Sequence, residues 1–407
     1  MMQTEKNSQL LIASCQLSVW LILDEIRYLT GLATQPEQAM GLINKLIQSM
    51  PSEKPAEAFR VGSLSELYLS ENKPKWLAAL INDIDDIITN QSKEHIASST
   101  KKTSVLLDSV FNVGANHQKN KPFMWPNIDD SSGYFPQMEG REIAQAKLTS
   151  AYKLLVKELN IGLDQIIDRN ITSWQIWSDS FLQLWQSITQ FVPAKSAEQS
   201  LFHTSKLKQA LATAIWRYLP HQELTTEASP EPWIAANKEK SISLIQGDFY
   251  GIQEFIFAHG GESQKQAHNL LRGRSFFISL VTELVLVKLL DSLSLPSNQV
   301  IINAAGKFLV IAPNIPATQN AVEKIKREME NWSRKHTHYM AGLGLTTANA
   351  SPLDLSNCQT SSLEALLTKL YQQQDIDKDQ RLNLLNKSTE QTLHKDYINA
   401  IDTNMGV

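Results

Sequence analysis

The chain has 407 residues, enough for two or three domains with a sizeable hydrophobic core. Its composition, 42% hydrophobic and 20% charged residues, excludes a largely disordered chain. The formal net charge of −4 excludes a generally basic nucleic-acid coat, although a local basic groove is compatible with it. Cys15 and Cys358 are too few for a zinc site or for a secreted disulfide framework, so we expect no zinc and a reducing cytoplasm.

The first apolar stretch, Leu10–Leu23, is interrupted by polar residues. Only about four apolar residues precede Cys15, against about 7–15 in the core of a secretory signal. No other stretch approaches the roughly 18–20 apolar residues of a membrane-spanning helix. We therefore predict an amphipathic, buried helix here and no association with a membrane.

The first 240 residues are expected to be almost entirely helical, because their apolar residues recur at spacings of three and four. A polar break at 116–134 interrupts this pattern, and prolines and acidic residues at Pro220–Lys240 predict a linker and the main domain boundary. The tryptophans of these helices are expected in the core rather than as base-stacking platforms. The expected helices are Leu10–Leu29, Gln38–Gln48, Leu64–Leu69, Trp76–Ile88, Ser104–Phe111, Arg141–Leu159, Trp174–Phe191 and Lys206–Tyr218.

After the linker, short strands alternate with long helices in the order β-α-α-β-β-α-β. This order suits a ferredoxin-like split βαβ sheet with helices on one face. We therefore predict an α+β protein with a helical domain at 1–220, a linker at 221–240, a ferredoxin-like domain at 241–350 and a polar helical tail at 351–407. The helix Leu270–Leu293 is apolar nearly all round and should be well buried. The other expected elements are strands Ser241–Gln246, Gln299–Asn303, Phe308–Ala312 and Gly342–Thr347, and helices Ile252–His259, Thr318–Tyr339 and Leu363–Tyr371.

The most informative motif is Gly247-Asp-Phe-Tyr-Gly251, between a predicted strand and a predicted helix. Asp248 would follow the strand at the carboxyl edge of the sheet, where palm-type nucleotidyltransferases hold Mg²⁺ against a triphosphate. Gly251 would allow a tight entry into a helix whose N–H groups face a phosphate. The alternative is that Asp248 only caps that helix.

A second motif, Arg272-Gly273-Arg274-Ser275, is predicted at the start of the apolar helix. The two arginines could clamp phosphates bidentately, with Ser275 adding a donor, or they could simply be solvated in an exposed first turn.

The third motif is the hairpin turn Ala304-Ala305-Gly306-Lys307. Two-metal catalysis needs more than one carboxylate, and Asp248 is the only acid near this turn. We therefore expect neither a catalytic residue nor a metal site in this domain, although Lys307 could contact phosphate or RNA.

Together the three motifs resemble the first palm domain of the large subunit of type III CRISPR interference complexes, in its Csm-type (subtype III-A) form. The resemblance covers roughly Ser241–Thr347, with weaker similarity around Ser104–Phe111 and Ser200–Lys206. It implies contact with a nucleotide, ATP with Mg²⁺, through the motif residues. These are Gly247, Asp248, Phe249, Gly251, Arg272, Gly273, Arg274 and Ser275, with a hairpin contact through Gly306 and Lys307.

The differences from the family are as informative as the resemblance. The family's HD nuclease binds metals through a His-Asp pair, and no adjacent His-Asp pair occurs in this chain. At Phe202-His203-Thr204 the family's Asp-His is replaced. The zinc element and the second palm with its Gly-Gly-Asp-Asp motif are also absent from the 407 residues. The resemblance therefore implies a degenerate HD-like domain without DNase chemistry, followed by a non-catalytic palm.

The function implied is that of the N-terminal half of an RNA-guided antiviral subunit. It would contact ATP and hold other Csm subunits, with crRNA and target RNA as indirect partners. Cyclic oligoadenylate synthesis would require a second palm from another chain, and we expect a split or truncated subunit. Two alternatives remain: a stand-alone nucleotide- or RNA-binding scaffold, and a metal-dependent single-strand DNase with unrecognised ligands.

Overall fold

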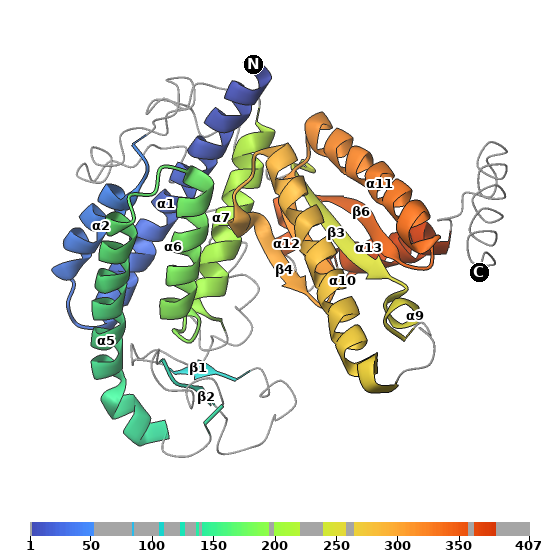
Figure 1. Cartoon of the computed structure of the whole chain (residues 1–407). Coiled ribbons are helices and arrows are strands. Elements are labelled where there is room, and N and C mark those ends of the chain that lie inside the picture. The colour runs from blue at the N-terminus through green and yellow to red at the C-terminus, as the bar shows by residue number, and fades with distance from the viewer. Residues whose placement is uncertain are drawn as a thin grey trace.

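The computed structural model describes residues 2–52, 84, 106–109, 123–126, 136–137, 141–194, 199–219, 239–257, 264–356 and 362–379. Helices dominate the described residues up to 219, and a four-stranded sheet follows (Figure 1). The predicted helices Leu64–Leu69 and Trp76–Ile88, apart from the helical Ile84, lie outside the described residues. So does most of the predicted linker.

The N-terminal part is built around α1, Met2–Leu32, whose side chains from Ile12 to Leu23 are all buried. The helix is therefore central rather than amphipathic, which corrects the prediction. Its buried hydroxyls are satisfied within the helix: Ser14 Oγ donates to the Leu10 carbonyl at 2.8 Å and Ser18 Oγ to the Ser14 carbonyl at 3.0 Å. By length and composition the stretch Asn7–Leu32 could cross a membrane, but 78% of its most apolar window is buried inside the protein, as in a core helix.

The other predicted helices of this part that fall on described residues are confirmed, with one exception. The helices around α1 are α2 (Gln38–Ser49), α5 (Arg141–Asp168), α6 (Trp174–Thr189) and α7 (Leu201–Tyr218). Their tryptophans belong to the core as predicted: Trp174, Trp177, Trp185 and Trp216 are all buried. Trp177 Nε1 donates to Ser49 Oγ at 3.1 Å, and Trp185 Nε1 to Ser205 Oγ at 2.8 Å, so indole N–H groups join α6 to α2 and α7.

The exception is the predicted helix Ser104–Phe111, which is wrong over its described residues. Leu107–Asp108 forms strand β1, paired antiparallel with β2, Phe123–Met124. The buried Leu106 and Phe123 both pack into the helical core. This long-range packing favours the extended backbone and overrides the local helical spacing.

The second part has the predicted order of strands and helices. Its strands pair antiparallel in the order β4-β5-β3-β6, which is the order of a split βαβ sheet. The elements are β3 (Ile242–Tyr250), α9 (Ile252–Phe257), α10 (Gln264–Leu293), the 3₁₀ turn η5 (Ser297–Gln299), β4 (Val300–Ala304), β5 (Lys307–Pro313), α11 (Pro316–Thr337) and β6 (Gly342–Ala350).

Both faces of this sheet are covered, whereas helices were expected on one face only. Ile245 and Phe249 of β3 pack with α10 and α11, while the alternating Ile242 and Leu244 join the core of the N-terminal helices. α7 lies on β5, and α13 (Ser362–Asp379), which follows the short α12 (Pro352–Ser356), lies on β6. The N-terminal helices and one face of the sheet therefore share a hydrophobic core, while the other face forms a second core with α10 and α11. The segment predicted as a polar tail contributes a packed helix.

Polar contacts also join the two parts. Asn298 Nδ2 of η5 donates to Ser18 Oγ of α1 at 2.6 Å and to Gln209 Oε1 of α7 at 2.9 Å. The Arg217 guanidinium of α7 donates to the Leu293 and Ser294 carbonyls at 3.1 and 3.0 Å. These carbonyls end α10, so an arginine from the first part caps a helix of the second.

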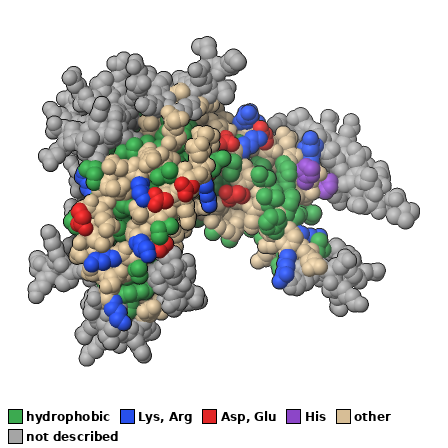
Figure 2. Space-filling view, turned by 60° about the vertical axis from the view of Figure 1, so that its left-hand side comes forward, with side chains coloured by type: hydrophobic (Ala, Val, Ile, Leu, Met, Phe, Trp, Pro, Cys, Tyr) green, Lys and Arg blue, Asp and Glu red, His purple; other side chains and the backbone are tan. Residues whose placement is uncertain are grey.

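Helix α10 is not buried all round, contrary to the prediction. Its inner face, with Ile278, Val285 and Leu289, packs on the sheet. Its outer face carries an apolar stripe that is exposed in this chain, and Figure 2 shows hydrophobic side chains gathered in a strip on the right-hand lobe. The stripe consists of Leu270 (42% exposed), Phe276 (68%), Phe277 (38%), Leu280 (42%), Leu284 (59%) and Val287 (46%).

Candidate nucleotide-contact site

Strand β3 runs on through the first motif instead of ending at Gln246. Asp248 is paired with Lys307 of β5 on one side and Gly344 of β6 on the other. It therefore lies inside the sheet, not beyond its edge. Gly251 directly precedes α9, so the alternative in which Asp248 caps that helix is wrong as well.

The hairpin turn brings a lysine to the Asp248 carboxylate. The two residues between β4 and β5, Ala305 and Gly306, have φ of 54° and 81°, as a type I′ turn requires. The Phe249 N–H donates to the Gly306 carbonyl at 2.9 Å and fixes the turn against β3. Lys307 Nζ then lies 3.6 Å from Asp248 Oδ2, with the lysine side chain 55% exposed and the carboxylate side chain 5% exposed.

This pairing determines the chemistry available to Asp248. An ammonium group beside a buried carboxylate compensates its charge and stands where a two-metal site would need a second acid. The described residues contain no group of three or more His, Cys, Asp or Glu side chains able to hold a metal ion. The arrangement can offer a half-exposed lysine to a phosphate.

Phe249 and Gly247 serve packing in this structure. Phe249 is buried in the core shared with α10. A Cβ added at Gly247 would overlap the ring of Phe308, which is itself buried. Gly251 has φ of 67°, and a Cβ there would overlap the Met340 carbonyl. The glycines are therefore required by close packing and by a left-handed backbone, independently of any ligand.

We expect Gly247→Ala to lower the free energy of unfolding by about 1–3 kcal/mol, because the new methyl group overpacks the Phe308 ring. Gly273→Ala is a matched control: its Cβ meets nothing within 4 Å, and it lies inside helix α10. That change should stabilise the chain by about 0.5–1 kcal/mol. Urea denaturation of both variants measures the two changes in the free energy of unfolding. Equal changes in the two variants would contradict the prediction.

The arginine motif lies in the interior of α10, because the helix begins at Gln264, earlier than predicted. The backbone N–H groups of 272–275 are therefore used within the helix and are not free for a phosphate. Arg274 Nη1 donates to the Ile256 carbonyl at 3.1 Å, and its guanidinium lies 5.9 Å from the centre of the Phe255 ring. Arg274 thus fastens α9 to α10, while Arg272 and Ser275 are exposed.

The two halves of the predicted nucleotide site lie on different faces of the sheet. The alternation along β3 turns Asp248 to the face of Ile242 and Leu244, whereas α10 covers the face of Ile245 and Phe249. The structure brings the Asp248 and Lys307 side chains together, whereas Gly306 of the same turn lies against Phe249 and Ile278 on the α10 side.

A glutamine on α13 belongs to the Asp248 face, and no motif or spacing in the sequence indicates it. Thr346 Oγ1 of β6 donates to Gln374 Oε1 at 2.8 Å, and Gln374 is 1% exposed. Its Nε2 is buried without a hydrogen-bond partner in the part of the chain that the structure describes, and it lies against Gly344, the neighbour of Asp248 across the sheet. Gln374 stands in the run 372–374, which in the sequence resembles a low-complexity segment.

His203, at the position where this sequence departs from the family's Asp-His, is exposed in the first turn of α7. Its ring meets that of Phe202 edge-on, with centroids 5.4 Å apart. Partial burial, and then the neighbouring Lys206, lower the pKa of His203, so the imidazole is neutral at pH 7. These contacts are those of an exposed histidine at a helix start that meets one neighbouring ring.

Comparison with known proteins identifies the relationship. Residues 241–396 match the family model of Csm1 subunit domain B. The chain is 26% identical over 256 residues to the single-strand-specific deoxyribonuclease Cas10/Csm1 (subtype III-A) of Thermococcus onnurineus, covering 62% of this chain and 29% of that protein. The chain is similar to the Cas10/Csm1 subunits. The Cas10/Csm1 protein of Mycobacterium tuberculosis is 29% identical over 273 residues, which cover 65% of this chain and 32% of that protein.

Solved Csm1 structures share the fold. A Csm1–Csm4 cassette in complex with pppApA aligns with a TM-score of 0.63 at 19% identity, covering 91% of this chain and 49% of that one. Csm1 of T. onnurineus aligns with a TM-score of 0.60 at 18% identity, with the same coverage. The chain therefore spans about a third of the length of its curated relatives and about half of the solved Csm1 chains. The predicted mixed α+β class and the Csm-type resemblance are confirmed.

Proposed function

We propose that this chain acts as the N-terminal half of a large subunit in a type III-A CRISPR complex, where it contacts ATP and holds other subunits. Residues 1–220 would be a degenerate HD-like domain, and residues 241–350 a first palm that carries no catalytic acid pair. Cyclic oligoadenylates would form from ATP and Mg²⁺ only when a second palm supplies those acids. The relatives' names and the nucleotide-bound Csm1–Csm4 structures support this reading.

The observation that carries the proposal is the pairing of Asp248 with Lys307. A single buried carboxylate 3.6 Å from an ammonium cannot bind two metal ions, so this sheet alone is a poor catalyst of phosphoryl transfer. The same lysine is exposed enough to meet a nucleotide phosphate brought by a partner domain. We propose a contact through Gly306 and Lys307 of the hairpin turn, with the Lys307 side chain on the Asp248 face. Arg272 and Ser275 would serve a ligand or partner that approaches α10.

The exposed stripe of α10 supports a role in assembly. A row of six apolar side chains on one helix face marks a surface that another protein covers. We propose that a Csm4-type subunit covers it, because the solved relatives of this fold include several Csm1–Csm4 assemblies. Exposed Arg272 and Asp291 lie toward opposite ends of the stripe and would fix the direction of the partner.

The test combines the purified chain with a polypeptide carrying the Gly-Gly-Asp-Asp palm, the other Csm subunits, crRNA, target RNA, ATP and Mg²⁺. We expect cyclic oligoadenylates from the complete mixture and none when either palm is left out. Lys307→Ala should lower the rate, and Lys147→Ala, at an exposed position on α5, is the control. Absence of product from the complete mixture would contradict the proposal and favour the stand-alone scaffold.

A further inference from the structure

Helix α13 lies against the face of the sheet that carries Asp248. It packs along β6 and also contacts β3. Gly344 of β6 stands directly opposite Asp248 of β3, and a Cβ added at Gly344 would lie 2.6 Å from the Nε2 atom of Gln374. Since the Cβ atoms of directly opposed residues are about 4.5–5.5 Å apart, the Gln374 amide fills the space beside the Asp248 side chain. That side chain is only 5% exposed, whereas Lys307 on its other side is 55% exposed.

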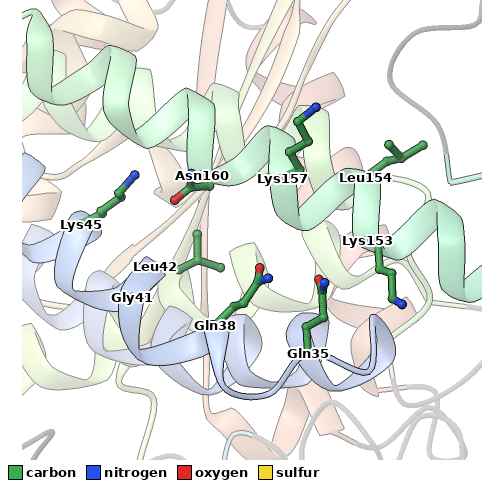
Figure 3. A pocket seen from close by; sticks show the side chains of 9 residues that line it. All are labelled: Gln35, Gln38, Gly41, Leu42, Lys45, Lys153, Leu154, Lys157 and Asn160. Carbon is green, nitrogen blue, oxygen red and sulfur yellow. The ribbon is translucent and has the colours of Figure 1, made fainter.

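The chain has an open cleft elsewhere, but it does not lead to this face. That cleft, of about 590 Å³, lies between α2 and α5 of the helical part, and Leu42, Lys45 and Lys157 are among the residues that line it (Figure 3). None of its lining residues belongs to the sheet or to α13. Access to the space beside Asp248 through the seat of α13 therefore depends on whether α13 stays in place.

The sheet surface around Gln374 is polar although it is buried. Gln246 and Asp248 of β3 share one face of the sheet, and Thr346 of β6 is directly opposite Gln246 on that face. All three residues are buried. Removing a polar side chain from water costs free energy, and returning it to water recovers that cost. This surface can therefore be exposed to water at a smaller cost than an apolar one.

The contacts that hold α13 on this surface are few. Among its side chains that the structure describes, 364–376, only Leu370 and Gln374 are buried. Leu370 belongs to neither of the two hydrophobic cores, and Leu366 is only partly buried against one of them. The Gln374 Nε2 atom has no hydrogen-bond partner among the described residues, and a buried donor left unpaired costs free energy. Few apolar contacts and an unpaired amide favour a helix that opens without unfolding the rest of the chain.

We propose that α13 is a detachable cover of the Asp248 face, and that a nucleotide reaches the polar side chains beside Lys307 only when α13 has left. The closed state is the arrangement described above. In the open state the Gln246 amide and the Thr346 hydroxyl would face the ligand and could donate hydrogen bonds to its phosphate or ribose oxygens. This regulation rests on the nucleotide contact proposed above.

Hydrogen exchange of the full chain tests whether α13 opens by itself. Leu370→Ala truncates a buried side chain and should speed exchange of the amides at 366–376 by at least about ten-fold. The double change Thr346→Val/Gln374→Leu replaces the incompletely paired polar contact by apolar groups and should slow that exchange by about three-fold. Tyr371→Ala truncates a neighbouring side chain that is 51% exposed, and this matched control should change the exchange by less than about two-fold. The amides of β3 and α10 are the internal reference and should exchange as in the parent chain.

The affinity for ATP separates a cover from an ordinary packed helix. If the ligand binds only the open state, its apparent affinity and the exchange rate of α13 both scale with the open fraction. A fluorescent ATP analogue is titrated with Mg²⁺ into the full chain together with the polypeptide that carries the second palm, and that polypeptide alone gives the baseline. Leu370→Ala should tighten binding by the same factor by which it speeds exchange, about ten-fold or more, while Tyr371→Ala changes neither.

Two results would overturn the cover itself. Exchange of α13 at the rate of β3 and α10, with Leu370→Ala speeding all three alike, would show that α13 opens only by global unfolding. Faster exchange of α13 in Leu370→Ala with an unchanged affinity for ATP would show that α13 does not control access. Absence of ATP binding by every chain would instead contradict the nucleotide contact and the regulation that rests on it. The cases are distinguishable because the exchange of α13 is measured without a ligand.

Discussion

The variant Arg217→Ala is expected to unfold with a free energy about 3 kcal/mol lower than that of the parent chain. The guanidinium donates to the carbonyls of Leu293 and Ser294 at the end of α10, and a hydrogen bond to a charged group contributes about 1.5–3 kcal/mol. Burial lowers the pKa of Arg217 to about 10, so the side chain is still charged at neutral pH. Alanine would remove the cap and leave both carbonyls in the contact between the two parts without a donor.

Urea denaturation at 25 °C measures this loss, and hydrogen exchange of the amides at 289–295 shows whether the end of α10 opens. Arg217→Lys should fall between parent and alanine variant, because an ammonium lacks the planar fork that reaches two carbonyls. Arg327→Ala, on the exposed side of α11, should change stability by less than about 0.5 kcal/mol. An equal, small effect of Arg217→Ala and Arg327→Ala would show that the cap does not hold the two parts together.

The sequence predicted the helices with strong periodicity because that signal is local. Helix α2 was expected at Gln38–Gln48 and is found at Gln38–Ser49, with Leu42, Ile43 and Leu46 buried on one face. The strand β1 was missed because its stability depends on Phe123 and on the helical core, which are distant in sequence. A prediction from residue spacing within one short stretch of sequence cannot detect such long-range contacts.

For the candidate site, the sequence identified Asp248 and the hairpin turn as candidate contacts, but it did not predict how they lie relative to each other. That Lys307 faces Asp248 follows from the register of β3 and β5, two strands separated by α9, α10 and β4. Gln374 reaches the same face only because α13 packs on β6. The sequence does not reveal the exposed face of α10 for a similar reason. An apolar helix face predicts that another surface covers it, but not whether that surface belongs to this chain or to another protein.

The exposed stripe of α10 leads to the prediction with the largest effect on assembly. Leu280→Glu/Leu284→Glu should weaken binding of a Csm4-type subunit from the same source by at least about a hundred-fold. Both side chains are exposed in the free chain, at 42% and 59%, so the variant should fold with unchanged stability. In the complex the new carboxylates would be removed from water without a partner, and even one such group costs several kcal/mol.

Isothermal calorimetry with the purified subunit measures the loss, and a thermal melt of the free variant confirms that it folds. The matched control, Ser279→Glu/Ser292→Glu, adds the same two charges to exposed positions of α10 that lie outside the stripe. Because those positions point away from the apolar row at 100° per residue, the control should retain binding within about three-fold. Equal binding by both double variants would show that a Csm4-type subunit does not cover α10. If the free parent chain dimerises and only the leucine variant stays monomeric, a second copy of the chain covers the stripe instead.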